Sequence, residues 1–392
     1  MTVEDGSSVS SCARCILTRA DDPQISFDDD GVCQHCRAFD AAWAHVPKTE
    51  KQSQALIDPL VRRIREAGRG RSYDCLIGIS GGVDSTYMAL LAKRLGLRTL
   101  AVHFDNGWNS ELAVNNIENT ISKLDIDLHT YVVDWDDFRE LQLAYLRASV
   151  IDIEALTDHA IYGAMYDIAI SRGIPFILSG VNIATESVLP SAWICDKLDF
   201  VNIQDIYNKF GSGKKLRNYP FVDYKRQKAI RNADVEVIRL LDMVPYDINA
   251  AKAEITEVLD WRPYPGKHFE SIFTRFYQGY ILPRKFGVQK RKAHLSNLIC
   301  CGAMTREEAL RAYQQEDYPQ ETKEQDREFV LKKLRLTDEE FESLMDESPR
   351  RHADFDNYRM LFRRYPALAP FRPLWDAYKA RRVRSRGEVI KV

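Results

Sequence analysis

The residues with the clearest chemical potential form a short string, SGGVDST, at residues 80–86. Before it, an apolar run from Cys75 to Ile79 is rich in leucine and β-branched side chains and ends at glycines, which predicts a buried strand. After it, apolar residues recur three to four positions apart as far as Leu95, which predicts a helix. The string is therefore expected to form the turn between a strand and a helix.

Such a turn is suited to bind phosphate. Gly81 and Gly82 lack Cβ atoms, so backbone N–H groups can approach an anion closely, and the free N–H groups of the helix start add a positive partial charge. Hydroxyl groups can donate to phosphate oxygens, whereas Asp84 is better suited to bind Mg²⁺. The nucleotide-binding residues predicted here are Ser80, Gly81, Gly82, Val83, Asp84, Ser85 and Thr86.

The string SGGVDS is similar to the PP-loop of ATP pyrophosphatases, which cleave ATP between the α- and β-phosphates. The alternative is an ordinary polar turn between a strand and a helix. The PP-loop is favoured because the six residues stand in the strand-to-helix context that the motif requires.

Three more strands are predicted, a buried one at 98–105 and two others at 128–133 and 175–178, each followed by polar residues or glycine. Strands that alternate with helices indicate an α/β fold with a parallel sheet, and ligands on such sheets bind at the carboxyl ends of the strands. The sequence resembles the HUP-like, Rossmann-like half of PP-loop ATPases such as GMP, NAD and asparagine synthetases. That resemblance implies adenosine contacts at Phe104, Asp105, Asn106, Gly107, Gly180 and Asn182.

Two CxxC pairs stand near the start of the chain, Cys12 with Cys15 and Cys33 with Cys36. Thiolates at this spacing can converge on Zn²⁺ as in a zinc ribbon, with the FDDDG stretch as the hairpin turn between them. Four thiolates leave no open coordination position, so a structural role is expected, with on the order of 10 kcal/mol from metal binding. A redox role is disfavoured because no βαβ pattern accompanies either pair. We expect His35 to be an exposed loop histidine.

Length and composition set the broad class. The chain has 392 residues and a net charge of −2, and this near-neutral charge gives no argument for nucleic acid. In a reducing compartment, its eight cysteines with their spaced pairs indicate metal or redox chemistry before disulfides. No apolar run approaches the ~20 residues of a membrane span, and no secretory signal is visible, so a cytoplasmic protein is expected. We divide it into a zinc-ribbon-like module at 1–45, a PP-loop domain at 46–235 and a mostly helical substrate-binding region at 236–392.

A block of mixed basic and aromatic residues begins at Trp261. Cations next to aromatic faces suit a nucleotide-sugar or nucleic-acid ligand, although a solvated basic helix face is the alternative. The predicted substrate contacts are Lys267, His268, Arg275 and Arg291. Lys285 or Lys290 is the expected clamp on departing pyrophosphate. Capping boxes predict two helices, at Thr305 with Glu308 and at Thr337 with Glu340.

Three other features are less specific. His159 is expected to be a satisfied histidine within a helix. Residues 183–233 are expected to be an inserted, partly mobile stretch, in which Glu186, Trp193 and Lys197 could line a pocket. Five basic residues at 379–386 are interpreted as a solvated helix end or a partner contact.

Several stretches together resemble the N-acetyl sugar amidotransferase family: the CxxC pairs, IGISGGVDS, HFDNGWNS, GKHFESIFTRFYQGYILPRKFG, KRKAHLSNLI and MTREEAL. These bacterial enzymes of lipopolysaccharide O-antigen and acidic-sugar biosynthesis turn an acetamido group into an acetamidino group. The resemblance covers nearly the whole chain. It implies ATP, Mg²⁺ and Zn²⁺, a nucleotide-activated diacetamido uronic acid or nonulosonic acid, and ammonia from a glutaminase similar to the imidazole glycerol phosphate synthase subunits.

The cysteines are consistent with a separate ammonia source. A glutaminase needs an activated cysteine at the mature N-terminus or on a nucleophile elbow, whereas Thr2 follows the first methionine and Cys300–Cys301 lacks the glycines of an elbow. We expect Cys300 and Cys301 to be buried structural thiols.

Two other functions stay open at this point. A PP-loop tRNA thiolation enzyme would also join CxxC pairs to SGGxDS, but with a basic surface and a free thiol pair of low pKa. The third option is a non-catalytic ATP-binding scaffold. The oligomeric state, including a homo-oligomer, is left open.

Overall fold

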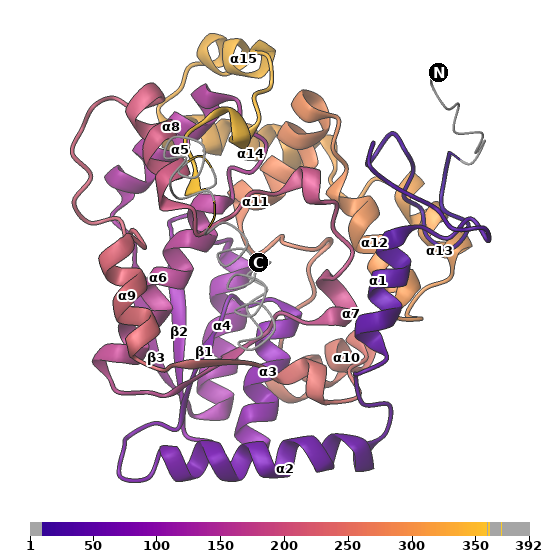
Figure 1. Cartoon of the computed structure of the whole chain (residues 1–392), viewed down its shortest axis with the longest axis vertical. Coiled ribbons are helices and arrows are strands. Elements are labelled where there is room, and N and C mark those ends of the chain that lie inside the picture. Colours follow the sequence, from indigo (N-terminus) through magenta and orange to yellow (C-terminus); the bar gives the residue numbers. More distant parts are fainter. Residues whose placement is uncertain (1–9, 359, 361–369, 371–392) are drawn as a thin grey trace.

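The computed structural model describes residues 10–358, 360 and 370, and every structural statement below concerns these residues (Figure 1). The basic cluster at 379–386 lies outside them. Among the described residues no helix is long and apolar enough to cross a bilayer.

A five-stranded parallel sheet supports the glycine turn (Figure 1). The strands are β1 (Cys75–Gly78), β2 (Thr99–Asp105), β3 (Asp127–Val132), β4 (Phe176–Ser179) and β5 (Glu236–Arg239), in the order β3-β2-β1-β4-β5. The direction of the strand order reverses at β1, between β2 and β4, which is the point where open parallel sheets bind ligands. The predicted α/β fold with a parallel sheet is confirmed. The fifth strand was not predicted, because only Ile238 of its four residues is buried.

Alternate side chains of the central strands pack on opposite faces of the sheet. Ile77 and Ala101 belong to a core with α2 (Glu50–Ala67), α3 (Val83–Arg94), α4 (Glu111–Leu124) and α10 (Ile248–Leu259). Leu76 and Leu100 belong to a core with α6 (Ala155–Ser171) and α9 (Tyr224–Asn232). Because both faces are covered, the strands read as continuous apolar runs, as the sequence showed.

The rest of the chain is mostly helical, as predicted. Its elements are α1 (Gln34–Trp43), α5 (Trp135–Ala148), α7 (Ile183–Glu186), η1 (Ser191–Trp193), α8 (Phe200–Phe210), η2 (Leu240–Met243), α11 (Ile272–Phe276), the π-helix η3 (Tyr277–Phe286), α12 (Lys290–Cys300), α13 (Arg306–Gln314), α14 (Gln320–Leu334), α15 (Asp338–Asp346) and η4 (His352–Asp354). The capping boxes predicted at Thr305 and Thr337 are present and begin α13 and α15. Residues 183–233, which were expected to be an inserted stretch, fold into helices with Trp193 and Lys197 buried.

The helix α6 buries His159 completely, and both ring nitrogens have partners. Nε2 accepts a hydrogen bond from the backbone N–H of Val222 (2.8 Å), so Nδ1 carries the proton and donates to the carbonyl of Lys197 (2.8 Å). A second proton would break the bond to Val222. Burial therefore lowers the pKa of His159 to about 4, and the ring is the satisfied histidine that was expected.

Acid should destabilise the protein through this residue. A histidine titrates near pH 6.5 in an unfolded chain, so between about pH 6.5 and 4 the unfolded state binds more protons and the free energy of unfolding falls as the pH falls. The shift from 6.5 to about 4 corresponds to about 3 kcal/mol over that window. Denaturant unfolding at a series of pH values measures the slope, and His159→Gln should reduce it. An imidazole NMR signal of His159 that titrates near 6.5 would contradict this expectation.

Candidate functional site

The glycine loop, residues 80–86, joins β1 to α3 at the carboxyl edge of the sheet. Gly82 is the N-cap of α3, and no side chain caps this helix, so the N–H groups of its first turn remain available to a ligand. The hydroxyls of Ser80 and Ser85 lie 3.2 Å apart, and Ser85 donates to the carbonyl of Gly82 (3.1 Å). The loop is thus held in shape by its own hydroxyl groups.

The backbone around the loop requires a glycine at position 81, and Gly82 lies directly against a carboxylate. Gly81 has a φ of 82°, and a Cβ there would lie 2.7 Å from the carbonyl oxygen of Ala113. A Cβ on Gly82 would overlap Oε1 of Glu270. Side chains at either position would therefore displace α4 or Glu270.

Two aromatic residues hold the carbonyl of Gly81 from outside the loop. Trp261 donates its indole N–H to this oxygen (2.8 Å), and the Tyr264 hydroxyl donates to it as well (3.1 Å). Trp261 is buried in the core of the sheet. The segment after α10 therefore fixes the orientation of the Gly81 carbonyl in the loop, a role that the sequence analysis did not identify.

Asp84 lies in the first turn of α3, with a neutral donor on each carboxylate oxygen. The Tyr246 hydroxyl donates to Oδ1 (2.5 Å), and the Thr185 hydroxyl of α7 donates to Oδ2 (3.2 Å). The end of β4 approaches the same helix start, since a Cβ on Gly180 would lie 3.4 Å from the amide nitrogen of Ser85. The carboxylate is thus oriented by residues from two other parts of the chain, neither of which was predicted.

Two further carboxylates and a lysine surround Asp84. Lys267 donates to Glu186 Oε1 (3.2 Å) and to the carbonyl of Thr185 (3.1 Å). Burial raises the pKa of Glu186, and Oε2 of this residue is buried without a partner among the described residues. Burial also raises the pKa of Glu270, to about 7. Carboxylate oxygens are the ligands that Mg²⁺ prefers, so Asp84 with Glu186 fits a magnesium ion.

The residues predicted to contact adenosine lie at the ends of β2 and β4. Phe104 stacks on Tyr131 with the ring centroids 5.6 Å apart. Asp105 accepts hydrogen bonds from the amide of Gly107 (2.8 Å), and Asn106 accepts from the amide of the following tryptophan (3.2 Å). These bonds mean that the side chains shape the turn after β2.

The other predicted contacts at these strand ends are also engaged in local bonds. Lys333 donates to the carbonyl of Gly107. Asn182 accepts from the amide of Thr185 (3.0 Å) and so caps α7. Adenosine binding at Phe104, Asp105, Asn106, Gly107, Gly180 and Asn182 stays a prediction.

Two predicted residues have surroundings that differ from those expected. Thr86 is completely buried, and its hydroxyl has no partner among the described residues, so a contact between Thr86 and phosphate stays a prediction. Lys285 donates to the carbonyls of Leu344 and Glu347 (2.6 Å each), where it stabilises the C-terminal end of α15. The Nζ of Lys290 instead lies 5.6 Å from the centre of the Tyr277 ring, and no ion pair engages it within the described residues. Lys290 is therefore the better candidate for the clamp.

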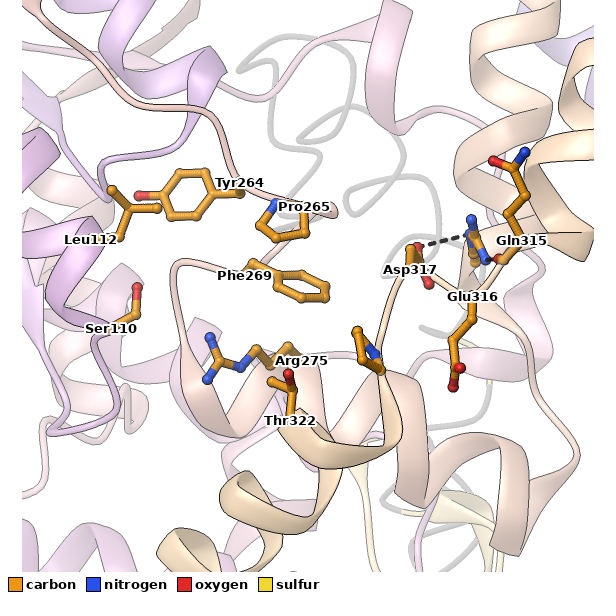
Figure 2. Close-up of a pocket in the computed structure, with 12 residues that line it drawn as sticks. Ser110, Leu112, Tyr264, Pro265, Phe269, Arg275, Gln315, Glu316, Asp317 and Thr322 are labelled. Atoms are coloured by element: carbon orange, nitrogen blue, oxygen red, sulfur yellow. Dashed lines mark hydrogen bonds and ion pairs between the residues drawn. The ribbon is translucent and has the colours of Figure 1, made fainter.

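A pocket of about 560 Å³ opens beside the glycine loop (Figure 2). Ser110 and Leu112 from the start of α4 line one side, and Figure 2 shows the rings of Tyr264 and Phe269 between them and Asp317. The other lining residues are Pro265, Arg275, Arg291, Gln315, Glu316, Pro319 and Thr322. Aromatic faces with a few polar groups are typical of small-molecule sites.

Both arginines predicted to bind substrate line this pocket, and each is paired with a carboxylate. Arg275 forms two bonds of 2.6 Å with Asp326, and Arg291 lies 2.8 Å from Asp317. The positive charges that line the pocket are therefore balanced by carboxylates. Lys267 and His268 lie instead on the Glu186 side, and His268 has a left-handed φ of 64°, which a residue with a Cβ rarely adopts.

The four N-terminal cysteines form a compact, buried group. Their Sγ atoms all lie within 4.8 Å of one another, and the separations include 3.9 Å for Cys12–Cys36 and 3.7 Å for Cys33–Cys36. Tetrahedral zinc with Zn–S distances of about 2.3 Å requires sulfur separations of about 3.8 Å. The predicted metal module is thus supported, and the group suits zinc. His35 is not exposed as expected but bonds to Asp22 (2.8 Å).

Several bonds join the metal module to α12 and α13, beside which α1 lies in Figure 1. Arg14 donates to the carbonyl of Cys300 (3.2 Å), and Arg306 donates to the carbonyl of Cys15 (3.2 Å). Cys300 is buried with its Sγ 3.6 Å from Cys36, as a structural thiol. One turn earlier in α12, Asn297 accepts a hydrogen bond from the amide of Val188 (2.8 Å), which fixes the chain just after α7. The module is therefore connected to the helix that holds Thr185.

Two family profiles match separate parts of the chain. Residues 74–165 match the queuosine biosynthesis protein QueC, and residues 270–369 match the C-terminal domain of WbpG-like LPS biosynthesis proteins. No curated protein matches. Among solved structures, the NMN synthetase from Francisella tularensis is similar at 16% identity, with 74% of this chain and 96% of that chain covered and a TM-score of 0.33. The NAD⁺ synthetase from Burkholderia pseudomallei is similar at 20% identity, with 58% and 95% covered and a TM-score of 0.30.

The pocket combines residues from both matched segments. Ser110 belongs to the first segment, together with the glycine loop, and Arg275 belongs to the second. Glu270 is the first residue of the second segment and lies against Gly82 of the first. The nucleotide loop of one matched segment and the late motifs of the other therefore meet at one place.

Proposed function

Since this chain belongs to a lipopolysaccharide-related family of PP-loop amidotransferases, we propose that it converts an acetamido group of a nucleotide-activated sugar into an acetamidino group. The PP-loop family performs ATP-dependent amidation chemistry in general. The finer assignment rests on one observation: the pocket that carries Arg275 and Arg291 opens next to the glycine loop. A sugar in that pocket is placed to meet the α-phosphate of ATP bound at α3.

The proposed reaction begins with activation of the amide. An amide carbonyl is a poor electrophile, and ammonia cannot expel its oxygen at a useful rate. The acetamido oxygen therefore attacks the α-phosphate of ATP and forms an O-adenylyl imidate, while pyrophosphate leaves along the amides of the glycine loop. Bound Mg²⁺ would offset the negative charge of the leaving pyrophosphate, and Asp84 with Glu186 would hold it. Lys290 is the proposed second clamp.

Ammonia then attacks the activated carbon, and AMP leaves. The cysteines of the described residues support an external ammonia source, since burial raises the pKa of Cys75, Cys195 and Cys301. A separate glutaminase is proposed as the partner. The same raised pKa values argue against the tRNA thiolation alternative, which needs thiolates that attack near neutral pH.

Mass spectrometry of reaction mixtures tests the proposal. The enzyme, ATP, Mg²⁺, ammonium and a nucleotide-activated diacetamido uronic acid should give a product in which one oxygen is replaced by NH. AMP and pyrophosphate should form in equal amounts, and reactions without ammonium should give no amidine. Formation of ADP would contradict the proposal, and so would the release of AMP from ATP without a sugar, as a scaffold or unrelated pyrophosphatase would show.

A further inference from the structure

The three carboxylates beside the glycine loop differ in how their oxygens are engaged. Asp84 accepts from two hydroxyl groups, and Glu186 is paired with Lys267. Glu270 has no side-chain partner among the described residues, its carboxylate accepts a hydrogen bond from its own backbone amide, and the residue is partly exposed. Of the three carboxylates, Glu270 is the one that has neither a proposed role in metal binding nor an ion pair, so it is available to a ligand.

The backbone around Glu270 fixes where this carboxylate lies. The carbonyl of Glu270 accepts from the amide of Ser110 (2.8 Å), and the amide of Ile272 donates to the carbonyl of Trp108 (2.8 Å). These bonds pair the segment 270–272 with the segment that follows β2. Because this pairing anchors the backbone at Glu270, the position of the residue next to Gly82 is a property of the fold.

This position lies between the two proposed substrates. Gly82 starts the helix that would bind the phosphates, whereas Ser110 and Tyr264 line the sugar pocket. Burial raises the pKa of Tyr264, and the negative charge of nearby Glu270 raises it further. The carboxylate is therefore close to both the phosphate seat and the pocket, where the activated carbon must be attacked.

We propose that Glu270 is a catalytic residue that accepts the proton released when ammonia attacks the adenylated acetamido group. This inference rests on the proposed function and deepens it. The nitrogen of the O-adenylyl imidate keeps its proton and carries a positive charge. The ammonia lone pair forms the C–N bond while the π electrons of the C=N bond return to that nitrogen, which leaves a positively charged ammonium nitrogen on the tetrahedral adduct. Glu270 removes one proton from that nitrogen, the C–O bond to AMP breaks with its electron pair on AMP, and an amidinium ion remains. One proton per turnover must be accepted, and Glu270 accepts it.

The other groups that face this point are less suited to the task. Burial and nearby cations lower the pKa of His268 and His294 well below the usual value, so both rings are weak bases. Tyr264 retains its proton because of its raised pKa. Glu270 is the carboxylate that lies directly against Gly82 and has neither an ion pair nor a hydroxyl partner among the described residues, so its position makes it the base that remains.

Glu270→Gln tests the proposal because it keeps the size of the side chain and removes only the proton acceptor. Two reactions are measured with the nucleotide-activated diacetamido uronic acid. Exchange of labelled pyrophosphate into ATP without ammonium reports adenylation and should stay within about twofold of the wild type. Ammonium-dependent amidine formation should fall by about 10²- to 10⁴-fold, the usual contribution of general base catalysis.

Three controls separate this role from others. Hydroxylamine, whose adduct loses its proton far more readily, should restore turnover in Glu270→Gln. Glu270→Asp should retain part of the ammonium-dependent rate, and Glu307→Gln on the exposed face of α13 should behave as wild type. Loss of pyrophosphate exchange together with turnover, or ammonium-dependent turnover within threefold of wild type, would overturn the assignment. Absence of both reactions in the wild-type enzyme would instead contradict the proposed function.

Discussion

Replacing Asp84 with alanine is expected to abolish adenylation and leave the fold intact. The carboxylate is oriented by Tyr246 and Thr185 at the start of α3, where it faces the proposed phosphate site. Its removal deletes the proposed magnesium ligand, and losses of about 10³-fold are usual when such charge stabilisation is removed. Alanine is compatible with the first turn of a helix, so the thermal midpoint should change little. Pyrophosphate exchange into ATP measures the effect.

A matched variant distinguishes orientation from ligation. Tyr246→Phe removes one hydrogen bond to Asp84 and keeps the carboxylate, so a decrease of about tenfold is expected, as for the loss of one hydrogen bond. Full turnover in Asp84→Ala would remove the metal assignment. Equal losses in both variants would show that the position of the carboxylate matters more than its charge.

The second large effect is expected at the cysteine cluster. Cys12→Ser or Cys36→Ser removes one of four thiolates that lie within 4.8 Å of one another, and the N-terminal module has few other ways to stabilise its fold. Bound metal should fall below one equivalent, and the yield of soluble protein and the thermal midpoint should fall with it. Several kcal/mol of folding free energy depend on such a site. Elemental analysis and thermal unfolding provide the measurements.

The matched control for this experiment is Cys301→Ser. The thiol of Cys301 is half-buried and bonds to the carbonyl of Leu298 (3.5 Å), a bond that a serine hydroxyl can also form. This variant should bind metal and melt as the wild type does. Soluble and fully stable Cys12→Ser protein without metal would contradict a structural metal site.

The sequence was most informative where a local pattern decides the structure. The run before Ser80 and the glycines after it fixed the strand, the turn and the helix, because each signal is contained in a few neighbouring residues. The same holds for the capping boxes at Thr305 and Thr337 and for the spacing of the CxxC pairs. β5 was missed since a short edge strand with one buried residue has no distinct pattern.

The residues that bond to the glycine loop could not be predicted from the sequence, because they are distant from the loop in the chain. Trp261 and Tyr264 bond to Gly81, and Tyr246 bonds to Asp84, but nothing in their local sequence indicates a loop more than a hundred residues earlier. For Lys285 the local pattern indicated a different partner. Its place in a basic and aromatic segment suggested that it binds an anion, whereas it donates to carbonyl groups at the end of α15.

The contact between Asn297 and the end of α7 has a consequence for regulation. It joins the N-terminal cysteines to the helix whose Thr185 bonds to Asp84, so a displacement of α12 on loss of the metal would reach the proposed magnesium ligand through two hydrogen bonds. Occupancy at one site and nucleotide affinity at the other are then thermodynamically linked and reciprocal. Loss of the metal at the cysteines would in that case lower the affinity of the protein for nucleotide.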